Sequence, residues 1–157
     1  MPALQITLKK ISAERAALSC RRPDGSVTWS RMQPFFPLHD LTHVAVESTL
    51  GFRAAFFGLI ASGWTLEDFA RPGVAARLPE EALRAEIMVG VFDGLGWAPT
   101  HAEFSASFAA ALAGKGVPDF RVSPEQFAAI CRLRADLRAR WLAVPTGEAL
   151  QWEFALD

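Results

Sequence analysis

Apolar and polar residues alternate near both ends of the chain, at 4–8 and again at 150–156. A period of two residues is typical of a strand that buries one face. Residues 16–22 and 27–32 lie on either side of the segment 23–26, Pro-Asp-Gly-Ser, which contains the residue types that tight turns prefer. The sequence therefore predicts an N-terminal strand, a hairpin and a final strand that returns to the same sheet.

Between these strands the apolar period lengthens to about 3.6 residues, which predicts helices. Pro37 stands where a first helical residue belongs, and Gly63 follows the last periodic residue, so we expect a central, largely buried helix over 37–62. Strands first, helices in the middle and a strand last predict one α+β domain over 1–157, with a small antiparallel sheet packed against four to five helices. Start signals for the later helices are found at Thr65, Pro79, Thr100 and Ser123.

The composition of the chain restricts the kinds of molecule that we expect it to bind. A formal net charge of −1 provides no broad basic field, so we expect no nucleic-acid partner. The most apolar run, 54–64, is shorter than the roughly 20 residues that span a bilayer, so we expect no membrane partner. Two cysteines do not indicate a disulfide framework. These features predict a soluble cytoplasmic protein, and the absence of Asn and Tyr beside abundant Ala and Arg favours a bacterial source.

The central segment carries two of the three histidines, His39 and His43, one helical turn apart, and Glu47 follows one turn later. This spacing allows one helix to offer two imidazoles to a metal ion. The rise from His39 to Glu47 is about 12 Å, so a straight helix cannot bring all three side chains to one ion. A pair from this helix would need ligands from elsewhere.

Two carboxylates seven residues apart on a later helix, Glu86 and Asp93, are the best additional ligands. The candidate metal ligands are therefore His39, His43, Glu47, Glu86 and Asp93. Zinc suits imidazole and carboxylate ligands, with iron or manganese as alternatives. An open coordination position would allow a hydrolase-like activity through a bound water.

Two arginines, Arg134 and Arg138, fall inside the apolar stripe of the last long helix. They are candidate contacts for an anionic ligand. The alternative is that their stems cover apolar surface while their guanidinium groups reach water.

A second hypothesis is a non-enzymatic binding or interaction domain in which His39 and His43 are structural and bond to the backbone or to Glu47. Phe35 and Phe36, just before the central helix, would then form part of a contact patch, and a homo-oligomer is one partner that such a patch would allow. The sequence contains no complete catalytic constellation, so it does not decide whether the protein is an enzyme.

Residues 39–43, His-Asp-Leu-Thr-His, resemble the HExxH string of zinc proteases, but Asp40 is one methylene shorter than the glutamate of that string. The longer pattern formed by residues 35–43, Glu47 and 50–53 resembles a group of small bacterial proteins without known activity. This resemblance implies no activity, cofactor or substrate, and no functional residue is carried over from it.

Overall fold

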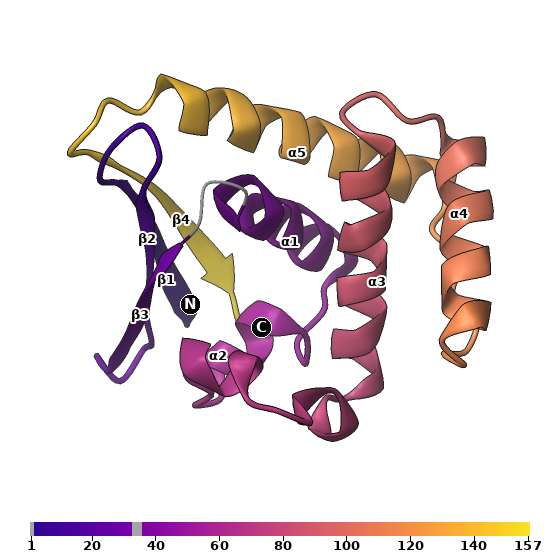
Figure 1. The fold of residues 1–157 in the computed structure, drawn as a ribbon, viewed down its shortest axis with the longest axis horizontal. Coiled ribbons are helices and arrows are strands. Elements are labelled where there is room, and N and C mark those ends of the chain that lie inside the picture. Colours follow the sequence, from indigo (N-terminus) through magenta and orange to yellow (C-terminus); the bar gives the residue numbers. More distant parts are fainter. Residues whose placement is uncertain (1, 33–35) are drawn as a thin grey trace.

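Four strands form an antiparallel sheet in the computed structural model, which describes residues 2–32 and 36–157. The strand order is β3-β2-β1-β4, so the first strand is central and the last strand lies at one edge (Figure 1). Leu8 of the first strand lies opposite Leu18 on one side and Leu150 on the other. The strand bounds are β1 Ala3–Lys10, β2 Ala16–Arg21, β3 Val27–Met32 and β4 Ala149–Ala155.

The alternating pattern determines which face of the sheet is covered. Leu4, Ile6 and Leu8 are buried, whereas the residues between them are partly or fully exposed. The predicted hairpin between β2 and β3 is confirmed, since the Arg22 N–H donates to the Ser26 carbonyl at 2.8 Å and Gly25 has a φ of 89°. The buried face of the sheet turns toward the helices.

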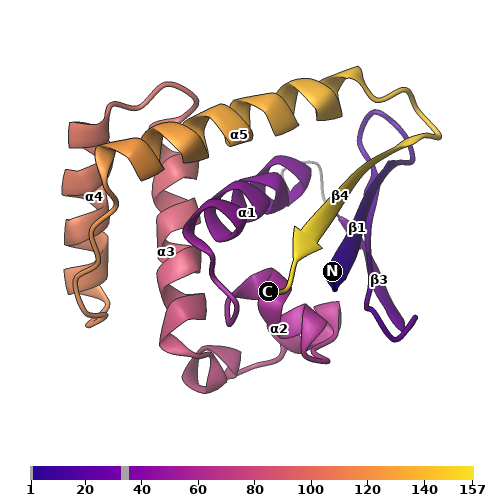
Figure 2. The ribbon, with the colours of Figure 1, turned by 180° about the vertical axis from the view of Figure 1, so that it is seen from behind.

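The first helix lies in the middle of the molecule, with the sheet on one side, the last helix across it and the third helix on the other side (Figures 1 and 2). Every residue from Asp40 to Glu47 is buried, as a central helix requires. The predicted α+β fold is therefore confirmed. The helix bounds are α1 Phe36–Leu50, α2 Phe56–Ala61, α3 Glu80–Leu95, α4 His101–Gly114 and α5 Pro124–Ala143, with short 3-10 helices η1 Leu66–Ala70 and η2 Val74–Arg77.

The expectation of one helix over 37–62 is wrong, because the helix ends at Leu50 and the chain re-enters a helix only at Phe56. Gly51 adopts a φ of 69°, and the N–H of Phe52 bonds the carbonyl of Glu47 at 3.0 Å. A left-handed residue followed by this backward bond is a common helix ending that glycine favours. Gly63 ends the second of the two helices instead of one long helix.

The second helix lies against the turn that precedes it, and Gly58 makes this approach possible. A Cβ atom added at Gly58 would collide with the backbone carbonyl of Arg53. We expect Gly58→Ala to lower the free energy of unfolding by about 1–3 kcal/mol, since neither backbone segment can move away cheaply. Urea unfolding followed by circular dichroism measures this change.

Gly90→Ala is the matched control, because Gly90 lies inside α3, is exposed, and has no atom near the position of an added Cβ. Alanine there should stabilise the protein by about 0.5–1 kcal/mol through its helix propensity. Equal effects of the two substitutions would contradict the close approach at Gly58.

Candidate metal centre

Two neighbouring helices supply the polar cluster. α1 carries His39 and His43 one turn apart, with ring centroids separated by 5.0 Å. α3 packs beside α1 and carries Glu86 and Asp93 two turns apart on the face that meets these rings. The cluster is thus built across the α1–α3 interface, and the packing of the two helices fixes its geometry.

The two Nε2 atoms converge on the carboxylate of Glu86. His43 Nε2 lies 3.0 Å from Glu86 Oε2, and His39 Nε2 lies 3.4 Å from Glu86 Oε1. One ligand atom from each of the three residues lies within 4.8 Å of the others. Bonds of about 2.1 Å in a tetrahedral site separate ligand atoms by about 3.4 Å. His39, His43 and Glu86 could therefore hold a metal ion.

The opposite nitrogen of each ring faces a different carboxylate. His39 Nδ1 lies 2.7 Å from Asp93 Oδ2, and His43 Nδ1 lies 2.9 Å from Glu47 Oε2. A carboxylate accepts hydrogen bonds, so each Nδ1 is the donor and each Nε2 is turned toward Glu86. Carboxylates that orient histidine ligands in this way are usual around protein-bound metals.

Glu47 is fully buried and uses both oxygens. Oε2 accepts from His43, while Oε1 accepts the backbone N–H of Phe57 at 2.9 Å. Phe57 is in the first turn of α2, where N–H groups have no partner within the helix. Glu47 therefore caps α2 and orients a ring of α1 at the same time.

The surroundings favour charged imidazoles when no metal is bound. Burial opposes the charged form of both rings, but hydrogen bonds to carboxylates outweigh it and raise the pKa of His39 to about 9 and that of His43 to about 10. Burial likewise opposes ionisation of Glu86, yet the hydrogen bonds from both rings lower its pKa well below the usual range. A metal would have to displace protons from both Nε2 atoms.

A pocket of about 510 Å³ opens beside the cluster. His39, His43 and Glu86 lie in its wall, so an ion held by them would face the pocket. Residues from the sheet, from α1 and α2 and from the 3-10 segment complete the wall, and most of them are apolar: Leu18, Met32, Phe36, Phe56, Leu66, Phe69, Val74 and Leu78.

Of the five ligand candidates from the sequence, the structure brings His39, His43 and Glu86 together at one point. Glu47 and Asp93 lie behind the rings on the Nδ1 side. Asp40 is a polar residue of this pocket that was not among the five. Burial raises the pKa of its carboxyl to about 7, against the opposing effect of the positive rings of His43 and His39.

The two candidate anion contacts lie elsewhere. The buried Arg134 donates to Thr42 Oγ1 at 3.0 Å and also to the carbonyls of Phe92 and Gly96. Its guanidinium lies 3.9 Å from the ring centroid of Trp97, and that of Arg138 lies 4.5 Å from the same ring. Neither arginine lines the pocket beside the histidines. Binding of an anionic ligand by Arg134 or Arg138 elsewhere stays a prediction.

The predicted contact patch is described only in part, because Phe35 lies outside the described residues. Phe36 is 45% exposed and lies in the wall of the pocket beside the histidines. The ring centroids of Phe36 and His39 are 5.9 Å apart. Self-association through this patch stays a prediction.

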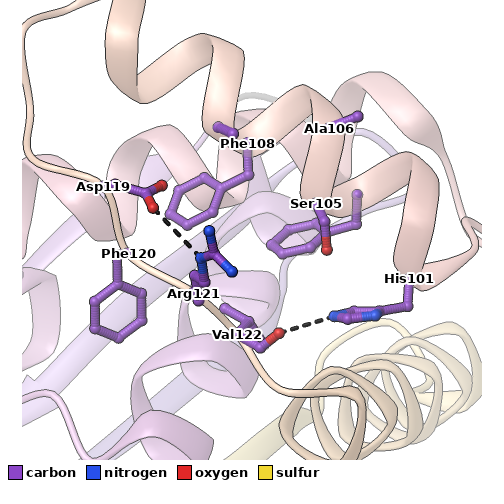
Figure 3. Close-up of a pocket in the computed structure, with 10 residues that line it drawn as sticks. His101, Ser105, Ala106, Phe108, Asp119, Phe120, Arg121 and Val122 are labelled. Carbon is purple, nitrogen blue, oxygen red and sulfur yellow. Dashed lines mark hydrogen bonds and ion pairs between the residues drawn. The ribbon is translucent and has the colours of Figure 1, made fainter.

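A second cavity of about 390 Å³ lies between α4 and the segment 119–122 (Figure 3). Its histidine, His101, is bonded through Nε2 to the Val122 carbonyl at 2.8 Å, and Asp119 pairs with the exposed Arg121. Among the residues that the structure describes, only the group at α1 and α3 has metal-ligand geometry.

Comparison of the chain with protein families, with curated proteins and with solved structures finds no match. The resemblance of the central segment to small bacterial proteins therefore stays a prediction. None of the helices within 2–32 and 36–157 combines the length and the apolar character that crossing a bilayer requires.

Metal-free protein should lose stability as the pH rises. Both histidines have a folded pKa above the unfolded value of 6.5, so their contribution is complete below about pH 6.5 and is lost as the pH passes through about 9 and 10. We expect the free energy of unfolding, measured by urea in the presence of EDTA, to fall between about pH 7 and about pH 9.5. A flat profile over this window would contradict charged rings in the metal-free cluster.

Proposed function

We propose that His39, His43 and Glu86 bind one divalent metal ion and that the protein is a hydrolase-like enzyme acting on small molecules. The observation that carries this proposal is the convergence of two Nε2 atoms on one carboxylate while both Nδ1 atoms are held by other carboxylates. Zinc fits two imidazoles and a carboxylate, with iron or manganese as alternatives.

Three protein ligands leave at least one coordination position for water. A zinc ion held by these residues would lower the pKa of a bound water to about 7, as catalytic zinc sites do, and would thereby supply a hydroxide nucleophile near neutral pH. The adjoining pocket supports a small-molecule substrate, because volumes of roughly 300–1,000 Å³ are usual for such ligands. Glu47 and Asp93 would keep the two Nε2 lone pairs directed at the ion.

Protein purified without a His tag should contain about one equivalent of zinc, iron or manganese by elemental analysis, or take it up on reconstitution. His39→Ala, His43→Ala and Glu86→Gln should each lower metal content or affinity at least tenfold, since each removes one of three ligands. Thermal unfolding establishes whether the variants remain folded.

His101→Ala is the matched control, because the third histidine bonds the Val122 carbonyl and lies outside the cluster. It should retain the metal. If the wild-type protein neither contains nor takes up any of the three metals, His39 and His43 are structural, and the interaction-domain hypothesis replaces the enzyme.

The carboxylates behind the rings should affect metal affinity without being ligands. We expect Asp93→Asn to weaken metal binding about 10- to 100-fold, because the hydrogen bond that orients His39 and increases its basicity is weakened. Competition with a chromophoric chelator measures this affinity. An affinity equal to that of the wild type would show that Asp93 does not orient a metal ligand.

A further inference from the structure

One carboxylate in the pocket wall, that of Asp40, accepts no hydrogen bond from the described part of the chain. Asp40 is only 8% exposed, and no residue within 2–32 and 36–157 donates a hydrogen bond to its side chain. The Asp40 oxygens are not fully enclosed by protein atoms, and Asp40 lines the pocket. A buried carboxylate without a donor is costly to stability, so a donor that arrives in the pocket would satisfy it.

Asp40 lies beside the candidate metal centre and not within it. The three residues whose ligand atoms lie within 4.8 Å of one another are His39, His43 and Glu86. A helical rotation of about 100° per residue turns Asp40 away from His39, to a flank of α1. Residues of the sheet, Leu18 and Ser30, line the same pocket. Asp40 is therefore available to a ligand that occupies the pocket next to the ion.

The rest of the wall is suited to an apolar body. The ring centroids of Phe56 and Phe69 lie 4.7 Å apart, and those of Phe69 and Trp64 lie 5.1 Å apart. Leu66 and Leu78 extend this surface. Aromatic and aliphatic walls with a small number of polar groups are typical of small-molecule sites.

We propose that this pocket binds a small primary amine with an aromatic or branched apolar body, and that Asp40 accepts hydrogen bonds from its ammonium group. The two imidazoles already face the carboxylates of Glu47, Asp93 and Glu86, so they are not available to Asp40 as donors. Arg31, the arginine among the described residues of the wall, is exposed. An ammonium supplies three hydrogen-bond donors to Asp40, whereas a carboxylate ligand supplies none.

The choice of substrate class rests on the proposed function. If the metal site is that of a hydrolase, the amine site determines which substrates it accepts. The substrate would be an amide or ester that carries such an amine close to its carbonyl. The oxygen of the attacking water forms a bond to the carbonyl carbon, the bond from that carbon to the leaving nitrogen or oxygen breaks, and the leaving atom takes a proton from the water. The ammonium held by Asp40 places the carbonyl beside the metal.

Binding of 2-phenylethylamine, 2-phenylethanol and phenylacetate to the full chain, measured by calorimetry and by NMR shifts near pH 7.5, tests the proposal. In the metal-free protein the amine should bind at least tenfold more tightly than the alcohol, and phenylacetate should bind most weakly. Asp40→Asn keeps the side-chain shape and should abolish the preference for the amine. Asp136→Asn, at an exposed position of α5, should leave all three affinities unchanged.

Thermal unfolding separates ligand binding from a structural role. If Asp40 serves the ligand, Asp40→Asn should leave the Tm unchanged or higher, because a buried charge is removed. A lower Tm, an amine preference that survives Asp40→Asn, or no amine binding at millimolar concentration would overturn the proposal. Metal content is measured separately, and amine binding is measured with and without the metal. Loss of the metal site would appear as absent metal with amine binding retained, whereas loss of the amine site would appear as absent amine binding with metal retained.

Discussion

The buried carboxylate of Glu47 connects the histidine cluster of α1 to the start of α2. One oxygen orients His43, and the other accepts the N–H of Phe57 at the start of α2. In an uninterrupted helix that N–H would bond the carbonyl of Arg53, so the break at Gly51 releases the donor that Glu47 uses. A buried charge is stable only when such partners are in place, and the position of α2 and the orientation of the ring are therefore coupled.

The cluster also depends on the contact between α1 and α3. Each histidine is held on its Nδ1 side by one carboxylate, Glu47 from its own helix and Asp93 from the neighbouring helix. Glu86 meets both rings from α3. A shift of one helix along the other by a single turn, about 5.4 Å, would separate these groups. The apolar packing that fixes the helices therefore also fixes the polar geometry.

The sequence predicts the strands, the hairpin and the helix starts well, because turn residues and capping boxes act locally. It fails at Gly51, where a helix-ending glycine is present but Gly63 offers an equally good signal farther along. It identifies both histidines and three carboxylates without separating Glu86 from Glu47 and Asp93. Which carboxylate can be a metal ligand depends on which ring nitrogen of each histidine faces α3. The packing of two segments that are distant in the sequence determines that orientation. Asp40 is visible in the sequence, but the pocket it faces is not.

The pairing of β1 with β4 affects the order in which the sheet can form. β1 is made before β2, β3 and β4 and lies inside the sheet, yet its partner β4 spans Ala149–Ala155. All the residues of the cluster precede Leu95, so they leave the ribosome before the strand that completes the sheet. Closing the long loop between β1 and β4 is slow compared with forming local helices. During synthesis the edge of β1 that pairs with β4 has no partner among β2 and β3, so it can mispair until β4 is made.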